Sequence, residues 1–164
     1  ASSILKTTPE NLIGSINKMK KQIQDLEKKL SVLTEKAAMD IPSTLEKNKK
    51  SIVIKNTDVS IIAGRVDGLT TDQLGKIADG ISSNKKKSII LLAGEIDNRV
   101  AIVCKVSADI ADIAPASSII KYVSKIMGGS GGGKSHFAQG SGKNTNKIND
   151  IISKFTELIP QAIG

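Results

Sequence analysis

The sequence predicts an α/β protein of the mixed α+β kind, in which helices flank a small mixed β-sheet and a long coiled-coil helix precedes it. Two patterns lead to this prediction. Apolar residues recur at spacings of three and four over most of residues 9–41, and short β-branched runs alternate with helical patterns from residue 51 onward. We therefore expect a helical arm at residues 1–41 and a globular α/β domain at residues 42–164.

The arm has a strong helix start and a coiled-coil pattern. Thr8-Pro9-Glu10 supplies a capping hydroxyl, a proline at a position where its missing N–H is harmless, and a first-turn acid. The apolar positions that follow form about four heptads. They are Leu12, Ile16, Met19, Ile23, Leu26, Leu30, Leu33 and Ala37. Pro42 is expected to end the helix. The seam needs a second helix, from another copy of the chain (a homodimer) or from an upstream segment; alternatively the helix lies along its own globular domain.

Four strands are expected next, since each run is β-branched or apolar and is bounded by turn residues. They are Ser51–Lys55, Val59–Val66, Ser88–Ala93 and Arg99–Val106. The third is almost continuously apolar, which predicts helices on both of its faces. Asp97-Asn98 predicts a hairpin between the third and fourth strands.

Three helices are expected among these strands and after them. The first opens at Thr70 with a capping box to Gln73, and its buried stripe is Leu74, Ile77, Ala78 and Ile81. The second covers Ala116–Met127. The last carries Ile148, Ile151, Ile152, Phe155, Leu158 and Ile159 at helical spacing.

The charge of the chain is concentrated at its two ends. The formal net charge is +8, with ten lysines against six acids in residues 1–50, eight basic against eight acidic residues in 51–115, and six lysines against two acids in 116–164. Basic ends around a neutral middle favour a polyanionic partner, although a lysine-rich solvated surface would have the same composition. The sequence contains no apolar run of membrane length, so we expect a soluble cytoplasmic protein with no membrane partner.

The stretch from Gly128 to Lys143 holds seven glycines and is expected to form a loop at 128–142. Its first eight residues match the text of a phosphate-binding P-loop, but a helical pattern precedes them and no helical pattern follows Lys134. We instead expect an anion-binding nest of backbone N–H groups flanked by lysines, with two more lysines on the helix before it. The candidate phosphate-binding residues are Gly131, Gly132, Gly133, Lys134, His136, Gln139, Lys143, Lys121 and Lys125.

The chain offers little for catalysis, and we assign it no catalytic residue, metal ligand or cofactor. His136 is the one histidine, and no acidic or cysteine cluster has metal-ligand spacing. Cys104 is expected to be a buried small residue. Asp109 and Asp112 are expected in a solvated turn, and Asp79 is expected to accept structural hydrogen bonds. Phe137 either stacks on a base or anchors the glycine-rich segment to the core.

Several of these features together resemble the DHH-associated domain family, in the form found at the C-terminus of alanyl-tRNA synthetases. They are Leu74 with Asp79, the strand Ser88–Ala93, Ala116-Ser-Ser-Ile-Ile, the run Gly128–Lys134, and Ala138-Gln139 with Gly142. Ser135-His136-Phe137 departs from the family, where many relatives carry Pro and Asp.

The resemblance implies a domain that binds the outer corner of alanine-specific tRNA, supports aminoacylation and editing, and in some members contributes to dimerisation. It also implies that ATP and zinc are used only in upstream domains. An accessory nucleic-acid-binding domain of a DHH-family phosphoesterase or nuclease is the alternative.

Overall fold

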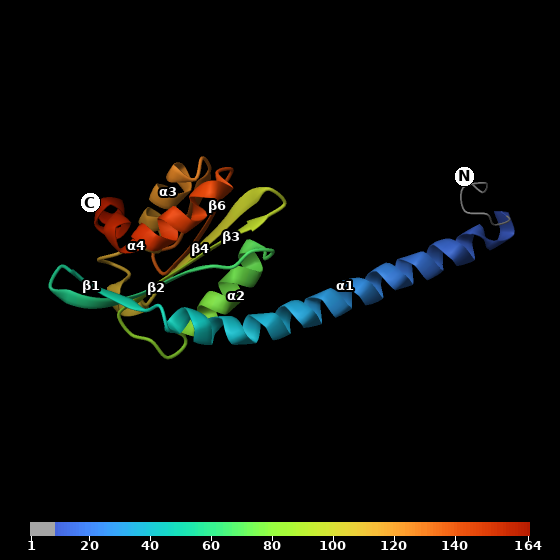
Figure 1. Ribbon diagram of the computed structural model, residues 1–164, viewed down its shortest axis with the longest axis horizontal. Helices are drawn as coiled ribbons and strands as arrows, with labels where there is room; N and C mark the ends of the chain where they lie inside the picture. Colours follow the sequence, from blue (N-terminus) through green and yellow to red (C-terminus); the bar gives the residue numbers. More distant parts are fainter. Residues whose placement is uncertain (1–8) are drawn as a thin grey trace. The chain divides into compact units, whose positions relative to one another are not determined.

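The computed structural model describes residues 9–164, and it describes their side chains at positions 12–29 and 41–164. The chain divides into two compact units, one up to Asp40 and the other from Ile41 to Gly164. Helix α1 (Pro9–Glu46) makes up the described part of the first unit and enters the second (Figure 1). Within the described part of the chain, no helix is both long and apolar enough to cross a bilayer.

The predicted seam of α1 is exposed along the described part of the first unit. Between 44% and 60% of the surface of Ile16, Met19, Ile23 and Leu26 is accessible, and Leu12 is half-buried. The side chains of Leu30, Leu33 and Ala37 lie outside the described residues.

The prediction that Pro42 ends this helix is wrong, because α1 continues for another turn to Glu46. A proline inside a helix removes one backbone hydrogen bond. The turn after Pro42 offsets this loss by burying Leu45, whose side chain fills the space beside Gly64. Long-range packing of this kind is not visible in the local sequence.

The second unit is built on a mixed sheet, as predicted, and this sheet has six strands where the sequence indicated four. The strands are β1 (Lys50–Ile54), β2 (Thr57–Arg65), β3 (Ser88–Ile96), β4 (Arg99–Val106), β5 (Ser130–Gly133) and β6 (Phe137–Gly142). Their order is β1-β2-β3-β4-β6-β5. Only β2 and β3 run parallel, because helix α2 (Thr71–Ser82) crosses between them, and every other neighbouring pair is antiparallel.

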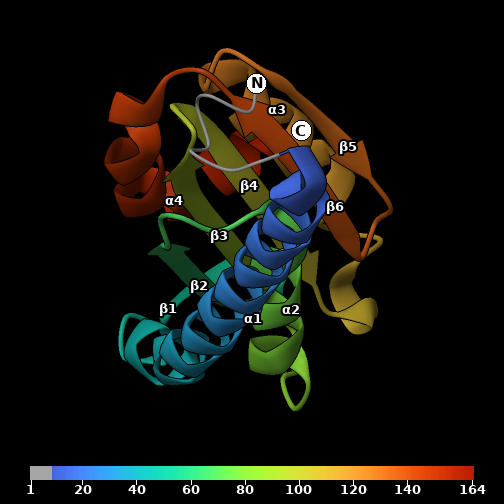
Figure 2. The ribbon, with the colours of Figure 1, turned by 90° about the vertical axis from the view of Figure 1, so that its right-hand side faces the viewer.

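Helices cover both faces of this sheet. Helices α3 (Ala116–Ile126) and α4 (Ile148–Ile163) pack on one face, and α2 packs on the other (Figures 1 and 2). Residues 88–94 of β3 are buried, as expected for a strand covered on both sides. The stripe predicted for α2 is buried, as are Ile148, Ile151, Phe155 and Ile159 of α4.

Two local predictions are confirmed in detail. The capping box of α2 is formed: the backbone N–H of Thr70 donates to Gln73 Oε1 at 3.0 Å, and the N–H of Gln73 donates to Thr70 Oγ1 at 3.3 Å. Asp97 and Asn98 both have positive φ and join β3 to β4 in a two-residue hairpin.

The glycine-rich segment differs from the prediction, because it forms two strands of the sheet instead of an open loop. Residues 130–133 are the edge strand β5, and residues 137–142 are β6, which pairs with β4. Glycine is unfavourable in strands. Here the close packing of α3 on the strands requires it.

Candidate functional site

The β5–β6 hairpin has two faces of different character, because successive residues of a strand point to opposite sides of the sheet. One face lies against α3. A Cβ atom built on Gly140 would lie 2.1 Å from Ser124 Oγ, and one built on Gly131 would lie 2.5 Å from Ile120 Cγ2. Glycine at these two positions therefore lets α3 approach the sheet closely.

The opposite face of the hairpin carries the residues that alternate with the buried ones. We call this face the ledge: Ser130, Gly132, Gln139 and Ser141. Helix α2 covers β3 and β4 on this side of the sheet and leaves the ledge open, since Gln139 and Ser141 are exposed and nothing lies within 4 Å of a Cβ built on Gly132. The backbone of Gly132 is thus accessible to a ligand.

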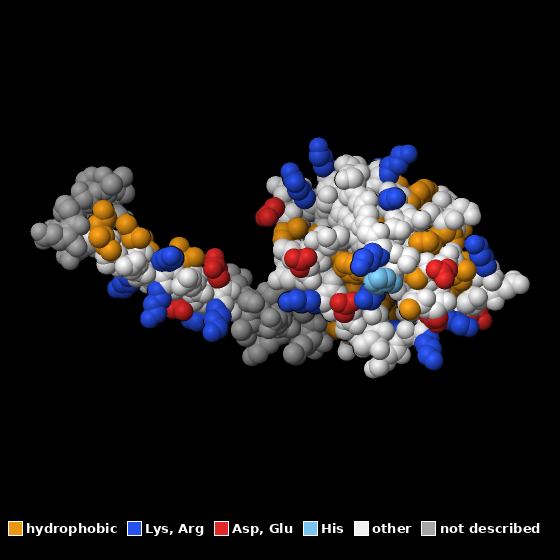
Figure 3. Space-filling model, turned by 180° about the vertical axis from the view of Figure 1, so that it is seen from behind, with side chains coloured by type: hydrophobic (Ala, Val, Ile, Leu, Met, Phe, Trp, Pro, Cys, Tyr) orange, Lys and Arg blue, Asp and Glu red, His pale blue; other side chains and the backbone are white. Residues whose placement is uncertain are grey.

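A hollow of about 400 Å³ lies where the ledge meets the C-terminal half of α2. Its lining includes Asp79, Lys105, Gly132, Gly133, Lys134, His136, Phe137 and Gln139. Three of these side chains are lysine or histidine, and one is acidic. Figure 3 shows the one histidine of the chain, in pale blue, beside basic side chains in blue. The arrangement favours an anion.

One ion pair and one aromatic ring organise the hollow. Lys105 on β4 donates from its Nζ to Asp79 Oδ1 at 2.5 Å, and the same ammonium lies 5.7 Å from the centre of the Phe137 ring. The ring packs on α2, since its Cζ would be 3.3 Å from a Cβ on Gly75. Phe137 therefore anchors the hairpin to α2, which is one of the two roles considered for it.

Backbone hydrogen bonds fix the turn that carries Lys134 and His136. The N–H of Lys134 donates to the carbonyl oxygen of Phe137 at 2.8 Å, and the N–H of Val106 donates to that of His136 at 2.9 Å. The turn is closed on β6 and tied to the end of β4. Both exposed side chains are thus presented from a constrained backbone.

The structure brings some of the predicted binding residues together and separates others. Gly132, Gly133, Lys134, His136 and Gln139 line the hollow.

The remaining predicted residues lie elsewhere. Gly131 faces α3, and Lys121 and Lys125 are exposed on α3, which covers the other face of the sheet. Lys143 follows the far end of β6, and the six residues of that strand span about 20 Å at 3.4 Å per residue. Lys134 and Lys143 therefore do not flank one nest, contrary to the sequence-based expectation.

The P-loop interpretation does not hold in this fold. A P-loop joins a strand to a helix that begins at its lysine. Here helix α3 precedes the glycines, and Lys134 lies in a turn between two antiparallel strands. Among the described residues, no group of three or more His, Cys, Asp or Glu side chains is arranged to hold a metal ion.

Cys104 and Asp109, which were also considered for chemistry, have roles in the fold. Cys104 is fully buried, and burial raises the pKa of its thiol far above the usual range. The Ser107 hydroxyl and the N–H of Lys87 lower the pKa of the Asp109 carboxyl, which binds that N–H at 2.9 Å.

Sequence reasoning missed Lys105 as a member of the site. The signal was present, because Lys105 is the charged residue inside the apolar run VAIVCKV, and such a residue usually has a partner. Its partner Asp79 is 26 residues away in the sequence, so only the packing of α2 on β4 could identify the pair.

Comparisons with known proteins give a consistent result. The family model described as the DHHA1 domain matches residues 58–161. The alanine–tRNA ligase of a Thermotoga species is 30% identical over 158 residues, which is 95% of this chain and 17% of that protein. The ligase of Fusobacterium nucleatum is 30% identical over 155 residues, with 94% and 17% covered.

A solved structure, the C-Ala domain from Aquifex aeolicus alanyl-tRNA synthetase, aligns with a TM-score of 0.59 at 25% identity. The alignment covers 67% of this chain and 97% of that domain. The chain spans less than a fifth of the length of these curated relatives.

Proposed function

The chain belongs to the DHHA1 domain family and is homologous to the C-terminal region of alanine–tRNA ligase, and from this premise we propose that it binds tRNA without carrying out a reaction itself. The proposed binding site is the hollow at the ledge, and the proposed partner is the alanine-specific tRNA named by its relatives. We propose that the joining of alanine to tRNA takes place in parts of such ligases outside the region that this chain matches.

One observation supports this site above all others: Lys105, Lys134 and His136 converge on an open glycine backbone. Lysine side chains are donors that bind phosphate oxygens in nucleic-acid interfaces, and the open side of Gly132 leaves space for a phosphate to approach them. The single carboxylate of the hollow, on Asp79, is already paired with Lys105. A phosphate therefore meets a net positive surface.

The aromatic side chains argue for contact with the RNA backbone instead of base stacking. Phe155 is buried, Phe137 packs on α2, and the hydroxyl of Tyr122 donates to Gln161 Oε1 at 2.6 Å on the other side of the sheet. A stacking surface for single strands needs several exposed rings on one face. Recognition of a folded RNA by its shape and phosphates needs none.

The salt dependence of tRNA binding tests this proposal. Each phosphate contact contributes about one unit to the slope of log K against log salt concentration, so Lys134→Ala should weaken binding and lower the slope by about one. Lys154→Ala is the matched control, because Lys154 is also exposed but lies on α4, on the other face of the sheet. Lys143→Ala, measured separately, asks whether the RNA extends along the full hairpin.

The result that contradicts the proposal is also clear. If Lys134→Ala and Lys105→Ala both leave the affinity and the slope unchanged within error, the hollow does not contact phosphate. If Lys154→Ala has the same effect as Lys134→Ala, binding is a diffuse attraction to the whole basic surface.

A second function, helix pairing, is favoured by a separate observation. Ile13, Ile16, Ile23 and Leu26 are all at least half exposed on α1. We propose that this face pairs with another helix, either of a second copy or of a preceding segment. Sedimentation of the chain with Ile23 and Leu26 replaced by glutamine measures the first option; a mass that is monomeric with and without the changes excludes the homodimer.

A further inference from the structure

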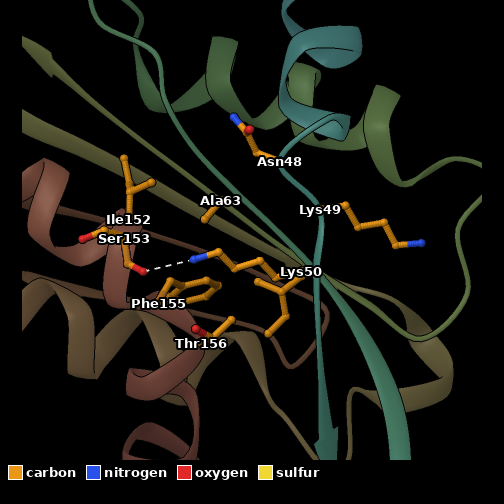
Figure 4. Close-up of a pocket in the computed structure, with 9 residues that line it drawn as sticks. Asn48, Lys49, Lys50, Ala63, Ile152, Ser153, Phe155 and Thr156 are labelled. Atoms are coloured by element: carbon orange, nitrogen blue, oxygen red, sulfur yellow. Dashed lines mark hydrogen bonds between the residues drawn. The ribbon is translucent and has the colours of Figure 1, made fainter.

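A recess separate from the hollow lies on the other face of the sheet, between α4 and the strands β1 and β2. Its volume is about 390 Å³. The residues that matter for its chemistry are Asn48, Lys50, Ala63, Ile152, Ser153, Phe155 and Thr156 (Figure 4). The proposed tRNA site does not use any of them.

The floor of the recess is apolar, and the small side chain of Ala63 leaves space above it. On this face of β2, Val59 and Ile61 are fully buried, and the next residue in the alternation is Ala63, which is half-buried. Alanine leaves room above the sheet where a larger side chain would fill it. Ile152 and Phe155 of α4 form the adjacent apolar wall. The floor of the recess is therefore apolar and leaves space above Ala63.

The rim of the recess is polar and carries two lysines, Lys49 and Lys50. In Figure 4 the side chain of Lys50 extends across the opening, and its Nζ donates to the carbonyl oxygen of Ser153 at 3.3 Å. This hydrogen bond is long and exposed, so an anion can compete for the ammonium at little cost. The amide of Asn48 and the hydroxyl of Thr156 add donors and acceptors. None of the described residues that line the recess is acidic.

We infer that this recess binds a nucleotide unit, with its base on the Ala63 floor and its phosphate at Lys50. A volume of about 390 Å³ lies in the range of sites for small organic ligands. The apolar faces of a base match the Ala63 floor and the Ile152 wall, its polar edge matches Asn48 and Thr156, and its phosphate matches the Lys50 ammonium. The same unit can come from a free mononucleotide or from an unpaired position of a single-stranded RNA.

Nuclear magnetic resonance titrations of the ¹⁵N-labelled chain test this inference. Adenosine 5′-monophosphate should shift the backbone amides of Ala63, Ile152 and Thr156 in a saturable way, and inorganic phosphate alone should not. Lys50→Ala should weaken binding about fivefold, which corresponds to about 1 kcal/mol at 1.4 kcal/mol per factor of ten. Ala63→Leu should abolish binding by filling the floor. Lys47→Ala, which changes an exposed lysine outside the lining, is the control.

The titrations also distinguish a free mononucleotide from an RNA strand as the source of the bound unit. Shifts of the same amides by a hexanucleotide RNA that competes with the mononucleotide identify a strand as the source, and shifts by the mononucleotide alone identify the free ligand. If about 10 mM mononucleotide shifts none of these amides, any affinity is weaker than millimolar and the inference is wrong. Equal shifts from phosphate alone also contradict it. If Lys50→Ala and Ala63→Leu both bind as the unchanged chain does, the recess is not the site. Lys134→Ala should leave this titration unchanged, so failure here is distinguishable from failure of the proposed tRNA site.

Discussion

Replacing Gly140 by alanine tests the packing that turns the glycine-rich segment into strands. The new Cβ would lie 2.1 Å from Ser124 Oγ and 3.2 Å from both Gly131 Cα and Ile120 Cγ2. Ser124 and Ile120 are fully buried on α3, so neither can move into solvent. The hairpin and α3 must therefore separate, or side chains must leave their preferred rotamers.

The expected cost follows from these contacts. Adding a methyl group to a well-packed core costs about 1–3 kcal/mol, and alanine recovers about 0.5–1 kcal/mol of the backbone entropy that glycine loses. The net loss of unfolding free energy should thus be about 2 kcal/mol. With a urea dependence of about 1–3 kcal/mol per molar, the unfolding midpoint should fall by about 1 M.

Gly132→Ala is the matched control for this measurement. Gly132 lies in the same hairpin, but it faces the ledge, where nothing lies within 4 Å of its Cβ position. This change should leave the urea midpoint unchanged or slightly raised. Circular dichroism during urea titration measures both variants under identical conditions.

A second substitution removes the atom responsible for the closest contact. Ser124 Oγ is buried and has no hydrogen-bond partner among the described residues, so Ser124→Ala alone should stabilise the fold by about 1 kcal/mol. In that background Gly140→Ala should cost less than about 1 kcal/mol, a coupling expected only for residues in contact. Equal costs for Gly140→Ala and Gly132→Ala, or no rescue by Ser124→Ala, would refute this reasoning.

Three further predictions concern charge and reactivity. Asp79→Asn should tighten tRNA binding about twofold to threefold in a filter-binding assay, because it frees Lys105 from a carboxylate that is 59% exposed and hence partly screened by salt. The thiol of Cys104 should react with iodoacetamide only after urea unfolding, since it is buried and its pKa is raised; labelling of the folded chain within minutes would contradict this. Because the pKa of Asp109 is lowered in the folded chain, its carboxylate adds to the free energy of unfolding. This stabilisation is fully present above the unfolded-state pKa of about 3.9 and is lost as the pH falls through the folded-state pKa. Asp109→Asn should therefore lower thermal stability at pH 7 and make no difference near pH 2, and equal losses at both pH values would argue against it.

The features that could be predicted from sequence are those set by nearby residues. The capping box of Thr70 and Gln73 and the Asp97-Asn98 hairpin depend on side chains within three positions of each other, and both occur as expected. The apolar patterns of α2, α3 and α4 likewise need only a helical period. These signals were enough to predict a mixed sheet with helices on both faces.

The features that could not be predicted depend on contacts between distant segments. The helix continues through Pro42 because Leu45 packs beside Gly64. Strands β5 and β6 pack closely under α3 because they have glycine opposite Ser124 and Ile120. The candidate site likewise depends on contacts between segments that are distant in the sequence. Five of its nine predicted residues meet in the hollow, but their register on β6 separates Lys134 from Lys143, and only tertiary packing reveals Lys105.

Along β5 and β6, residues that pack against α3 alternate with residues that face solvent. Gly131, Gly140 and Gly142 are held by their closeness to α3, so substitutions there threaten folding. Gln139 and Ser141 point the other way into open solvent and carry no such constraint. Substitutions at these outward positions can therefore change ligand preference without disturbing the packing of α3 on the sheet.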